Sequence, residues 1–177
     1  MWVDIFLAFF TLLLGLICIG MSYASWRIIT HKVPSIPTGK KIREAMITMA
    51  ELTKNQNIYD LGCGFGGILF AAQKRAPKNT FTGFDVVDPV IWWCRFKAFI
   101  CRRPINFQKK DFFTENFTEA DVIFCYLWPS IMDRIYTEIW PNLKPGTKLI
   151  SHAFKLPGIK PVRINSVKSH KIYTYVK

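Results

Sequence analysis

The chain has 177 residues, which is enough for one domain of ordinary size with an appendage. Half of the residues are hydrophobic and the mean hydropathy is +0.16, values that are high for a soluble enzyme and that suggest a membrane segment. The net charge of +12 favours anionic partners such as lipid headgroups, acidic proteins or nucleic acid. Five scattered cysteines without a C-x-x-C pair argue against a disulfide framework or a cysteine metal site.

The first predicted element is a helix within the uncharged stretch from Ile5 to Trp26, "IFLAFFTLLLGLICIGMSYASW". About 20 apolar residues cross the hydrocarbon core of a bilayer. Because Arg27 and Lys32 follow the stretch, the positive-inside rule predicts a single-pass anchor over residues 1–30, with the rest of the chain on the cytoplasmic or matrix-equivalent side. A cleaved signal peptide is an alternative, although the usual basic n-region is missing. A buried core helix is a second alternative, which a domain this small rarely accommodates.

Residues 31–39, "HKVPSIPTG", are typical of a linker because two prolines and a glycine stand in extended spacing. Thr38 is well placed to cap the following helix at its N-terminus. That helix is predicted over residues 40–52, since Ile42, Ala45, Met46 and Met49 share one face.

Beyond residue 55, strand-like and helix-like segments alternate. Strands are predicted at 57–61, 80–86, 105–111, 121–127 and 146–154, helices at 66–76, 89–103 and 129–143, and a closing antiparallel hairpin at 162–167 and 171–176. Such alternation predicts an α/β fold with a mainly parallel, Rossmann-like sheet covered on both faces, over residues 40–177. In such sheets ligands bind beyond the carboxyl ends of the strands.

The segment "IYDLGCGFGG", residues 58–67, places four glycines directly after the first predicted strand of this domain. Gly62, Gly64 and Gly67 fit the dinucleotide fingerprint G-x-G-x-x-G, while Gly62, Gly64 and Gly66 fit G-x-G-x-G. Asp85 ends the next strand, where a carboxylate can bind both ribose hydroxyls. A tight turn with a solvated aspartate is the alternative without a ligand.

Two features favour S-adenosylmethionine over a nicotinamide dinucleotide. The residues after Asp85 are all needed to complete one sheet, so no second domain remains to hold a dehydrogenase substrate. Asp60, next to the glycines, suits the ammonium group of S-adenosylmethionine, and the loop holds no Lys or Arg for a pyrophosphate.

These segments resemble class I S-adenosylmethionine-dependent methyltransferases. "YDLGCGFGG" is similar to their motif I, "GFDVVDP" to their ribose-binding second strand, "KKDFF" to their adenine-binding third strand, and "LKPGTKLISHAF" to their fifth strand. More narrowly, "VPSIPTGKKI" and "DFFTENFTEADVI" resemble the small archaeal protein-lysine methyltransferases and the membrane-anchored lysine methyltransferases of the ATP synthase c-subunit. The resemblance spans residues 33–176. Phe65 and Gly67 replace the Asp and Arg of the usual "GCGDGR".

The resemblance implies a role for each matching position. The expected cofactor-binding residues are Asp60 for the ammonium, Gly62, Gly64 and Gly66 for the methionine part, Asp85 for the ribose, and Asp111 with the Phe112 backbone for the adenine. The resemblance places Thr38 over the cofactor or the acceptor channel, and the segment from Tyr126 to Pro129, which includes Trp128, at the site of methyl transfer. His152, at the fifth-strand end, is a candidate to accept a proton or shape the site; a structural role is its alternative.

In-line methyl transfer needs alignment of donor and acceptor more than a catalytic triad, and no metal site is expected. A lysine acceptor must arrive as the neutral amine, which an apolar channel favours. Aromatic side chains are candidates to wall that channel: Trp92, Trp93, Phe113, Tyr126 and Trp128. For Trp92 and Trp93, packing in the core is the favoured alternative.

The prediction is a membrane-anchored protein-lysine N-methyltransferase that uses S-adenosylmethionine. A membrane protein is a candidate substrate. The alternatives are methylation of a lipid or small amphiphile, and a non-catalytic scaffold that keeps the fold. Nucleic acid is not expected as a partner, because Lys and Arg are dispersed and no aromatic-basic recognition motif stands out.

Overall fold

The computed structural model of the protein describes residues 2–31 and 37–177. The chain divides into two compact units, residues 1–35 and residues 36–177. The predicted linker, residues 31–39, lies partly outside the described residues, at 32–36.

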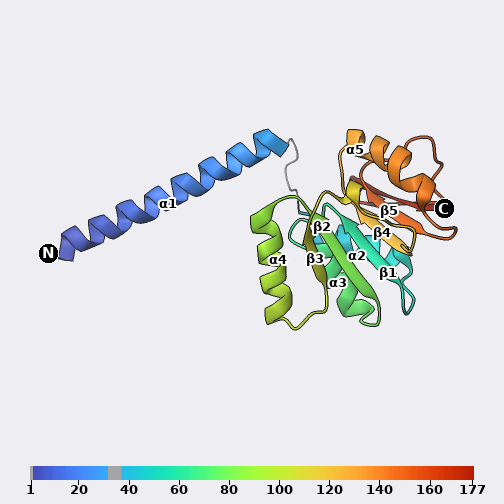
Figure 1. Ribbon diagram of the computed structural model, residues 1–177, viewed down its shortest axis with the longest axis horizontal. Helices are drawn as coiled ribbons and strands as arrows, with labels where there is room; N and C mark the ends of the chain where they lie inside the picture. The colour runs from blue at the N-terminus through green and yellow to red at the C-terminus, as the bar shows by residue number, and fades with distance from the viewer. Residues whose placement is uncertain (1, 32–36) are drawn as a thin grey trace. The chain divides into compact units, whose positions relative to one another are not determined.

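The first unit contains a single helix, α1, over Trp2–His31 (Figure 1). Its segment Trp2–Ser22 has a mean hydropathy of 2.5, and none of it is buried. At 1.5 Å per residue such a segment is about 30 Å long, the thickness of the hydrocarbon core. In the described residues, neither apolar core of the second unit includes a residue of α1, which gives the alternative of a buried core helix no support. By length and composition the helix can cross a membrane, and an N-terminal signal sequence passes the same test.

The second unit is built on a seven-stranded sheet with the order β3-β2-β1-β4-β5-β7-β6. All neighbouring strands run parallel except β7, which is antiparallel to both β5 and β6. The strands are β1 (Asn57–Leu61), β2 (Thr80–Asp85), β3 (Asn106–Lys109), β4 (Val122–Cys125), β5 (Lys148–His152), β6 (Arg163–Val167) and β7 (His170–Val176). The predicted Rossmann-like sheet with a C-terminal antiparallel hairpin is confirmed.

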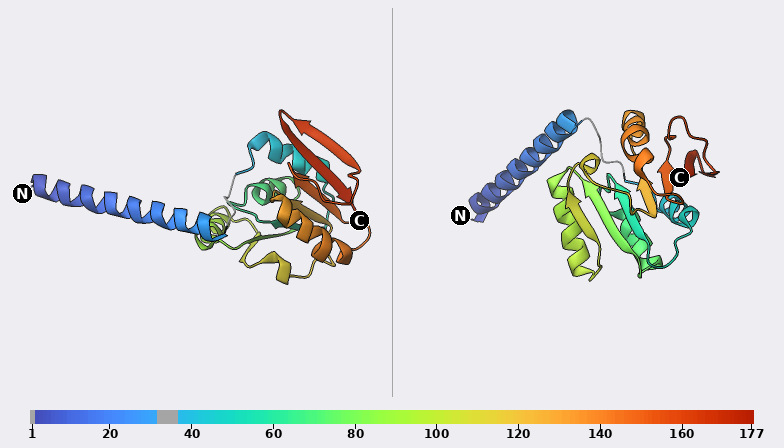
Figure 2. Two further views of the ribbon diagram at one scale, coloured as in Figure 1. Left: turned by 90° about the horizontal axis from the view of Figure 1, so that it is seen from above. Right: turned by 45° about the vertical axis from the view of Figure 1, so that its right-hand side comes forward.

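Helices pack on both faces of this sheet (Figures 1 and 2). One layer consists of α2 (Lys40–Ala50), α3 (Gly67–Arg75) and α4 (Asp88–Ile100), and the other of α5 (Pro129–Arg134), the π-helical turn η2 (Ile135–Ile139) and the 3-10 turn η3 (Trp140–Asn142). Each layer shares an apolar core with the strands, one around Leu69, Phe107 and Phe124 and the other around Phe84, Ile123 and Tyr175. The strand ends are thereby fixed from both sides.

The cap predicted for Thr38 is wrong. Helix α2 begins at Lys40 with Gly39 in the N-cap position, and no side chain caps it. The Gly39 carbonyl accepts the Arg43 N–H at 3.0 Å, as an N-cap carbonyl does. The helix therefore starts one residue later than a Thr38 cap requires, and the Thr38 side chain is left for another role.

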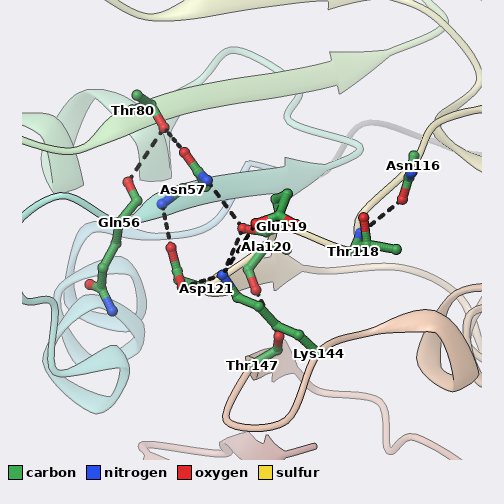
Figure 3. A network of polar contacts seen from close by, with 10 residues as sticks. All are labelled: Gln56, Asn57, Thr80, Asn116, Thr118, Glu119, Ala120, Asp121, Lys144 and Thr147. Carbon is green, nitrogen blue, oxygen red and sulfur yellow. Dashed lines mark hydrogen bonds and ion pairs between the residues drawn. The ribbon is translucent and has the colours of Figure 1, made fainter.

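A polar network fixes the amino ends of the strands, the edge of the sheet opposite to the one where ligands bind (Figure 3). Asp121 accepts the Asn57 N–H at 2.7 Å and pairs with Lys144 at 2.8 Å, while Thr147 donates to the Ala120 carbonyl at 2.7 Å. Burial acts to raise the pKa of Asp121, but the hydrogen bonds from Lys144 and Asn57 outweigh it and lower that pKa. The network holds β1 and β4 in register from behind the site.

Candidate functional site

The glycine turn follows β1 at the carboxyl edge of the sheet, where it was predicted. Gly62, Gly64 and Gly66 have φ angles of +71°, +50° and +70°, which L side chains rarely adopt. A Cβ on Gly66 would lie 2.7 Å from Cζ of Phe107, whereas a Cβ on Gly64 would meet no atom within 4 Å. The two positions therefore need glycine for different reasons. Gly66 is packed against the core, and Gly64 bares its backbone toward open space.

Asp85 connects the end of β2 to this turn. Its Oδ2 accepts the Gly64 N–H and its Oδ1 accepts the Val87 N–H, both at 3.0 Å. The side chain belongs to a residue that is only 8% exposed. Each carboxylate oxygen has further lone pairs, so Asp85 is held by the main chain and can still accept hydrogen bonds from a ligand. This is the position expected for a ribose-binding acid.

Asp60, the second carboxylate, ends up almost fully buried beside Asp85. Burial raises the pKa of Asp60 to about 8, and the negative charge of Asp85 adds to the effect. A carboxyl group that is buried near a second carboxylate stays protonated unless a cation binds beside it. The pair thus forms an electrostatic site for a positively charged group next to the glycine turn.

The predicted adenine-binding residues follow β3, the neighbour of β2 in the sheet. Asp111 is exposed, and its Oδ1 accepts the Phe113 N–H at 3.1 Å, capping the short turn η1 (Phe112–Thr114). The Lys110 N–H donates to the Asp85 carbonyl at 3.2 Å, which ties this segment to the ribose acid. Phe112 is buried. The two residues are therefore brought to the same edge as Asp85.

An aromatic cluster stands beyond the ends of β4 and β5. The Tyr126 and His152 rings lie 4.0 Å apart, Tyr126 stacks on Phe154 at 6.3 Å, and Trp128 lies 5.8 Å from Phe154. Tyr126, Trp128 and His152 were predicted here from the sequence, whereas Phe154 was not. Phe154 lies two residues after His152 in the segment "SHAF", and this proximity was the one sign of it in the sequence. The left-handed backbone at Ala153, with φ of +66°, could not be predicted from the sequence.

His152 is 2% exposed, and its Nε2 lies 3.2 Å from Nδ1 of His170, a contact that the sequence did not predict. Its own Nδ1 is buried with no hydrogen-bond partner among the described residues. Burial lowers the pKa of His152 to about 4, and the charge of His170 adds to the effect. His152 is therefore neutral at physiological pH. A group of this kind can accept or donate one hydrogen bond, but it is a weak base.

Four other candidates lie outside this aromatic cluster. Trp92 and Trp93 are 67% and 50% exposed on the outer face of α4, so the favoured prediction of core packing is wrong for both. Phe113 is partly buried under the Arg134 guanidinium, which lies 3.7 Å from the ring centroid. The Thr38 carbonyl accepts a hydrogen bond from Arg43 at 3.5 Å, and the same guanidinium would lie 2.8 Å from a Cβ on Gly67. Thr38 is therefore linked through Arg43 to the glycine turn.

Within the described residues, no group of three or more His, Cys, Asp and Glu side chains is gathered as a metal site. The five cysteines are free thiols, three of them buried. The acidic groups at this edge of the sheet are instead Asp85, which is bonded to the bared main-chain turn, and the buried Asp60 beside it. This arrangement fits a ligand with a cationic group and hydroxyls rather than a phosphate.

Comparison with known proteins gives matches over the same segments. The profile of the ANTKMT methyltransferase domain matches residues 60–163. A protein-lysine N-methyltransferase of Saccharolobus islandicus is 28% identical over 155 residues, which cover 81% of this chain and 93% of the relative. The adenine nucleotide translocase lysine N-methyltransferase of Mus musculus is 22% identical over 118 residues, which cover 66% of this chain and 51% of the mouse protein.

Among solved structures, an RNA methyltransferase from Salinibacter ruber in complex with S-adenosyl-L-homocysteine superimposes with a TM-score of 0.76. It is 25% identical, and the match covers 80% of this chain and 93% of that one. The profile match takes in the glycine turn, both carboxylates and the strands β2 to β5. The chain therefore belongs to the ANTKMT methyltransferase domain family and is an S-adenosylmethionine-dependent methyltransferase.

Proposed function

We propose that this methyltransferase acts on the lysine side chains of a protein and that helix α1 attaches it to a membrane. The observation that carries the proposal is the match to a protein-lysine N-methyltransferase, which covers 93% of that relative and therefore nearly its whole length. The named acceptor of the mouse relative is likewise a lysine. The aromatic cluster beside the carboxylates is chemically suited to such an acceptor.

The cofactor-binding roles proposed here go to residues at the carboxyl edge of the sheet. The methionine part would lie over Gly62, Gly64 and Gly66, with its ammonium near Asp60. The ribose would lie on Asp85, and the adenine near Asp111 and the Phe112 main chain. When bound, S-adenosylmethionine supplies a methyl group on a positively charged sulfur, which leaves as a neutral thioether. The role of the protein is then to hold the acceptor nitrogen in line with that methyl group.

Tyr126, Trp128 and Phe154 would line the entrance for the acceptor. Aromatic faces attract the amine while it is still a cation. Because they also exclude water, they lower the pKa of the amine and favour the neutral form that attacks the methyl group. His152 is neutral, buried and backed by His170, so it would shape the site from behind Tyr126 rather than remove a proton from the amine. Thr38 would lie at the rim of the site, as its link to Arg43 suggests.

The membrane part of the proposal depends on α1. The apolar segment Trp2–Ser22 is followed by basic residues, with Arg27 the first of them, and by the positive-inside rule this supports a domain on the cytoplasmic or matrix-equivalent side. A signal sequence would be removed from the mature protein. Mass determination of the protein isolated from membranes after carbonate washing therefore tests this point: the retained N-terminal helix supports attachment.

The acceptor is tested with full-length protein in detergent, a methyl-labelled donor and a solubilised membrane fraction from cells that lack the enzyme. We expect label in protein, recovered as methyllysine after hydrolysis. Label in the lipid extract or in RNA would instead identify a different acceptor class. Trp128→Ala should reduce the transfer rate by about tenfold or more while donor affinity is retained, because the side chain would line the acceptor entrance and not the cofactor site. A protein that binds the donor but labels no fraction is a scaffold.

The raised pKa of Asp60 predicts that proton release accompanies cofactor binding. At pH 7 the free protein holds Asp60 protonated, since its pKa is about 8, and the ammonium of the cofactor favours the ionised form. Calorimetric titration in buffers of different ionisation enthalpy should show release of a substantial fraction of one proton at pH 7 and almost none at pH 9.5. Asp60→Asn should abolish the difference between the buffers.

The same shift has a consequence for stability. Because the folded protein binds this proton more tightly than the unfolded chain, Asp60 destabilises the fold progressively as pH rises from about 4 to about 8. In the cofactor-free protein, Asp60→Asn should flatten this part of the pH–stability profile. An unchanged profile would show that Asp60 is already ionised in the folded protein.

A further inference from the structure

The outer face of α4 carries a continuous row of large apolar side chains. The members of this α4 stripe are Trp92, Trp93, Phe96, Phe99 and Ile100, which are 67%, 50%, 59%, 80% and 61% exposed. The opposite side of the same helix packs on the sheet through four buried residues, Val90, Ile91, Cys94 and Ala98. The spacing of i, i+4, i+7 and i+8 within the stripe is that of one helical face. Soluble monomers rarely expose so large an apolar patch without a function.

A basic groove adjoins the C-terminal end of the stripe. It has a volume of about 860 Å³, and its lining includes Phe99 and Ile100 together with Arg95, Arg102 and Arg103. Arg95 donates its Nε–H to the Phe107 carbonyl at 2.8 Å, and Arg103 donates to Gln73 at 2.9 Å. Two of the three guanidinium groups are thus anchored to the fold. Their other N–H groups can bind a phosphate, for which the guanidinium fork is well matched.

We propose that the α4 stripe and the basic groove dock on the surface of an anionic bilayer, as a second membrane contact beside α1. Trp and Phe on one helical face with Arg at its margin are typical of interfacial helices, which bury that face by roughly 5–10 Å in the headgroup region. The proposal rests on membrane attachment through α1, which immediately precedes the domain in the chain.

The charges favour a bilayer over a second copy of the chain. A two-fold contact between two α4 stripes would border the same basic groove in both copies, so it would offer these arginines no anionic partner. Anionic headgroups instead complement these arginines, and the chain as a whole carries +12.

The contact would orient the catalytic edge. Helix α4 begins at Asp88, three residues after Asp85, so the stripe and the cofactor acid are carried on adjoining segments. A bilayer seated on α4 therefore fixes the direction in which the carboxyl edge of the sheet faces. Such an orientation favours acceptor lysines close to the membrane surface.

The test uses full-length protein reconstituted in protein-free vesicles and a fluorescent thiol label at one site. The exposed cysteines, Cys18 and Cys101, are changed to Ser, and the remaining three are buried and inert to the label while the protein is folded. The label is attached at Phe96→Cys in the stripe, or at Ser166→Cys on β6, which is exposed at the opposite edge of the sheet. Quenching by lipid-borne nitroxide and by aqueous iodide is then measured for each.

We expect lipid-borne nitroxide to quench the label at position 96 by about twofold more than the label at 166, with the reverse order for iodide. Adding phosphatidylglycerol to phosphatidylcholine vesicles should strengthen the effect, and Arg102→Gln should weaken that dependence on anionic lipid. Equal iodide quenching at the two sites would overturn the proposal. Protection from iodide without lipid quenching would overturn it too, because it would mean that protein covers the stripe. Flotation of both labelled proteins with the vesicles after carbonate washing reports attachment through α1 separately.

Discussion

Asp85→Ala should reduce the affinity for S-adenosylmethionine by about 100-fold or more. Hydrogen bonds to a charged group contribute roughly 1.5–3 kcal/mol each, and the ribose would lose two of them. The substitution also removes the acceptor for the Gly64 and Val87 N–H groups, at 3.0 Å each, so the turn that cradles the methionine part loses its support. Isothermal titration of the full-length variant with the cofactor measures the effect.

Asp133→Asn is the matched control for this change, because it removes an exposed carboxylate on α5 and should leave the affinity within about twofold. The cofactor affinity of Asp85→Asn should lie between those of the other two variants. Its amide oxygen keeps one acceptor, but its amide nitrogen adds a donor opposite a main-chain N–H. Circular dichroism confirms that each variant is folded. An Asp85→Ala variant that is folded and binds the cofactor as tightly as the wild type would falsify the assignment of the ribose site.

Much of this edge of the sheet was predictable because it depends on local rules. A glycine cluster after a buried strand, with acids at the ends of adjacent parallel strands, brings Asp60 and Asp85 together in any right-handed βαβ unit. Their register, with β1 and β2 parallel from Asn57 opposite Thr80, is set by the alternation of buried side chains. Local sequence therefore contains enough information to place the cofactor edge.

The orientation of α4 was not predictable in the same way. The segment "PVIWWCRFKAFI" has apolar residues on every side, so its periodicity does not distinguish the face that meets the sheet from the face that meets solvent. The sheet is covered by the smaller residues, among them Cys94 and Ala98, and the tryptophans are left outside. Because large aromatic side chains usually pack in a core, the sequence favoured burial of Trp92 and Trp93, and that prediction was wrong.

The contact between His152 and His170 depends on long-range pairing. In the antiparallel register of β5 and β7, His152 lies opposite Ile172, which makes His170 its diagonal neighbour on the same face. That register is decided by the hairpin at the end of the chain. A reading of either histidine in its local sequence gives no sign of the other.

Gly66→Ala should destabilise the catalytic domain more than any other glycine substitution at the turn. The φ of +70° costs an alanine roughly 1–2 kcal/mol, and overpacking typically costs 1–3 kcal/mol more. The overlap here is with Phe107, whose Cζ and Cε1 would lie 2.7 and 2.9 Å from the new Cβ. Phe107 is 2% exposed in the core shared with α3 and α4, so its ring has little room to move. Thermal unfolding of the full-length protein in detergent should show a fall in Tm of roughly 5–15 °C.

Two other glycines separate backbone strain from packing and from cofactor contact. Gly64 and Gly146 have φ of +50° and +87°, and a Cβ on either would meet no atom within 4 Å, so both alanine variants should lose stability through strain alone. Gly64→Ala should in addition weaken cofactor binding by about tenfold or more, because its Cβ would occupy the space that the methionine part requires. Gly146→Ala, in the turn before β5, should bind the cofactor normally. Equal affinities for these two variants would show that the cofactor does not approach the main chain at Gly64, and the turn would then serve only to connect β1 to α3.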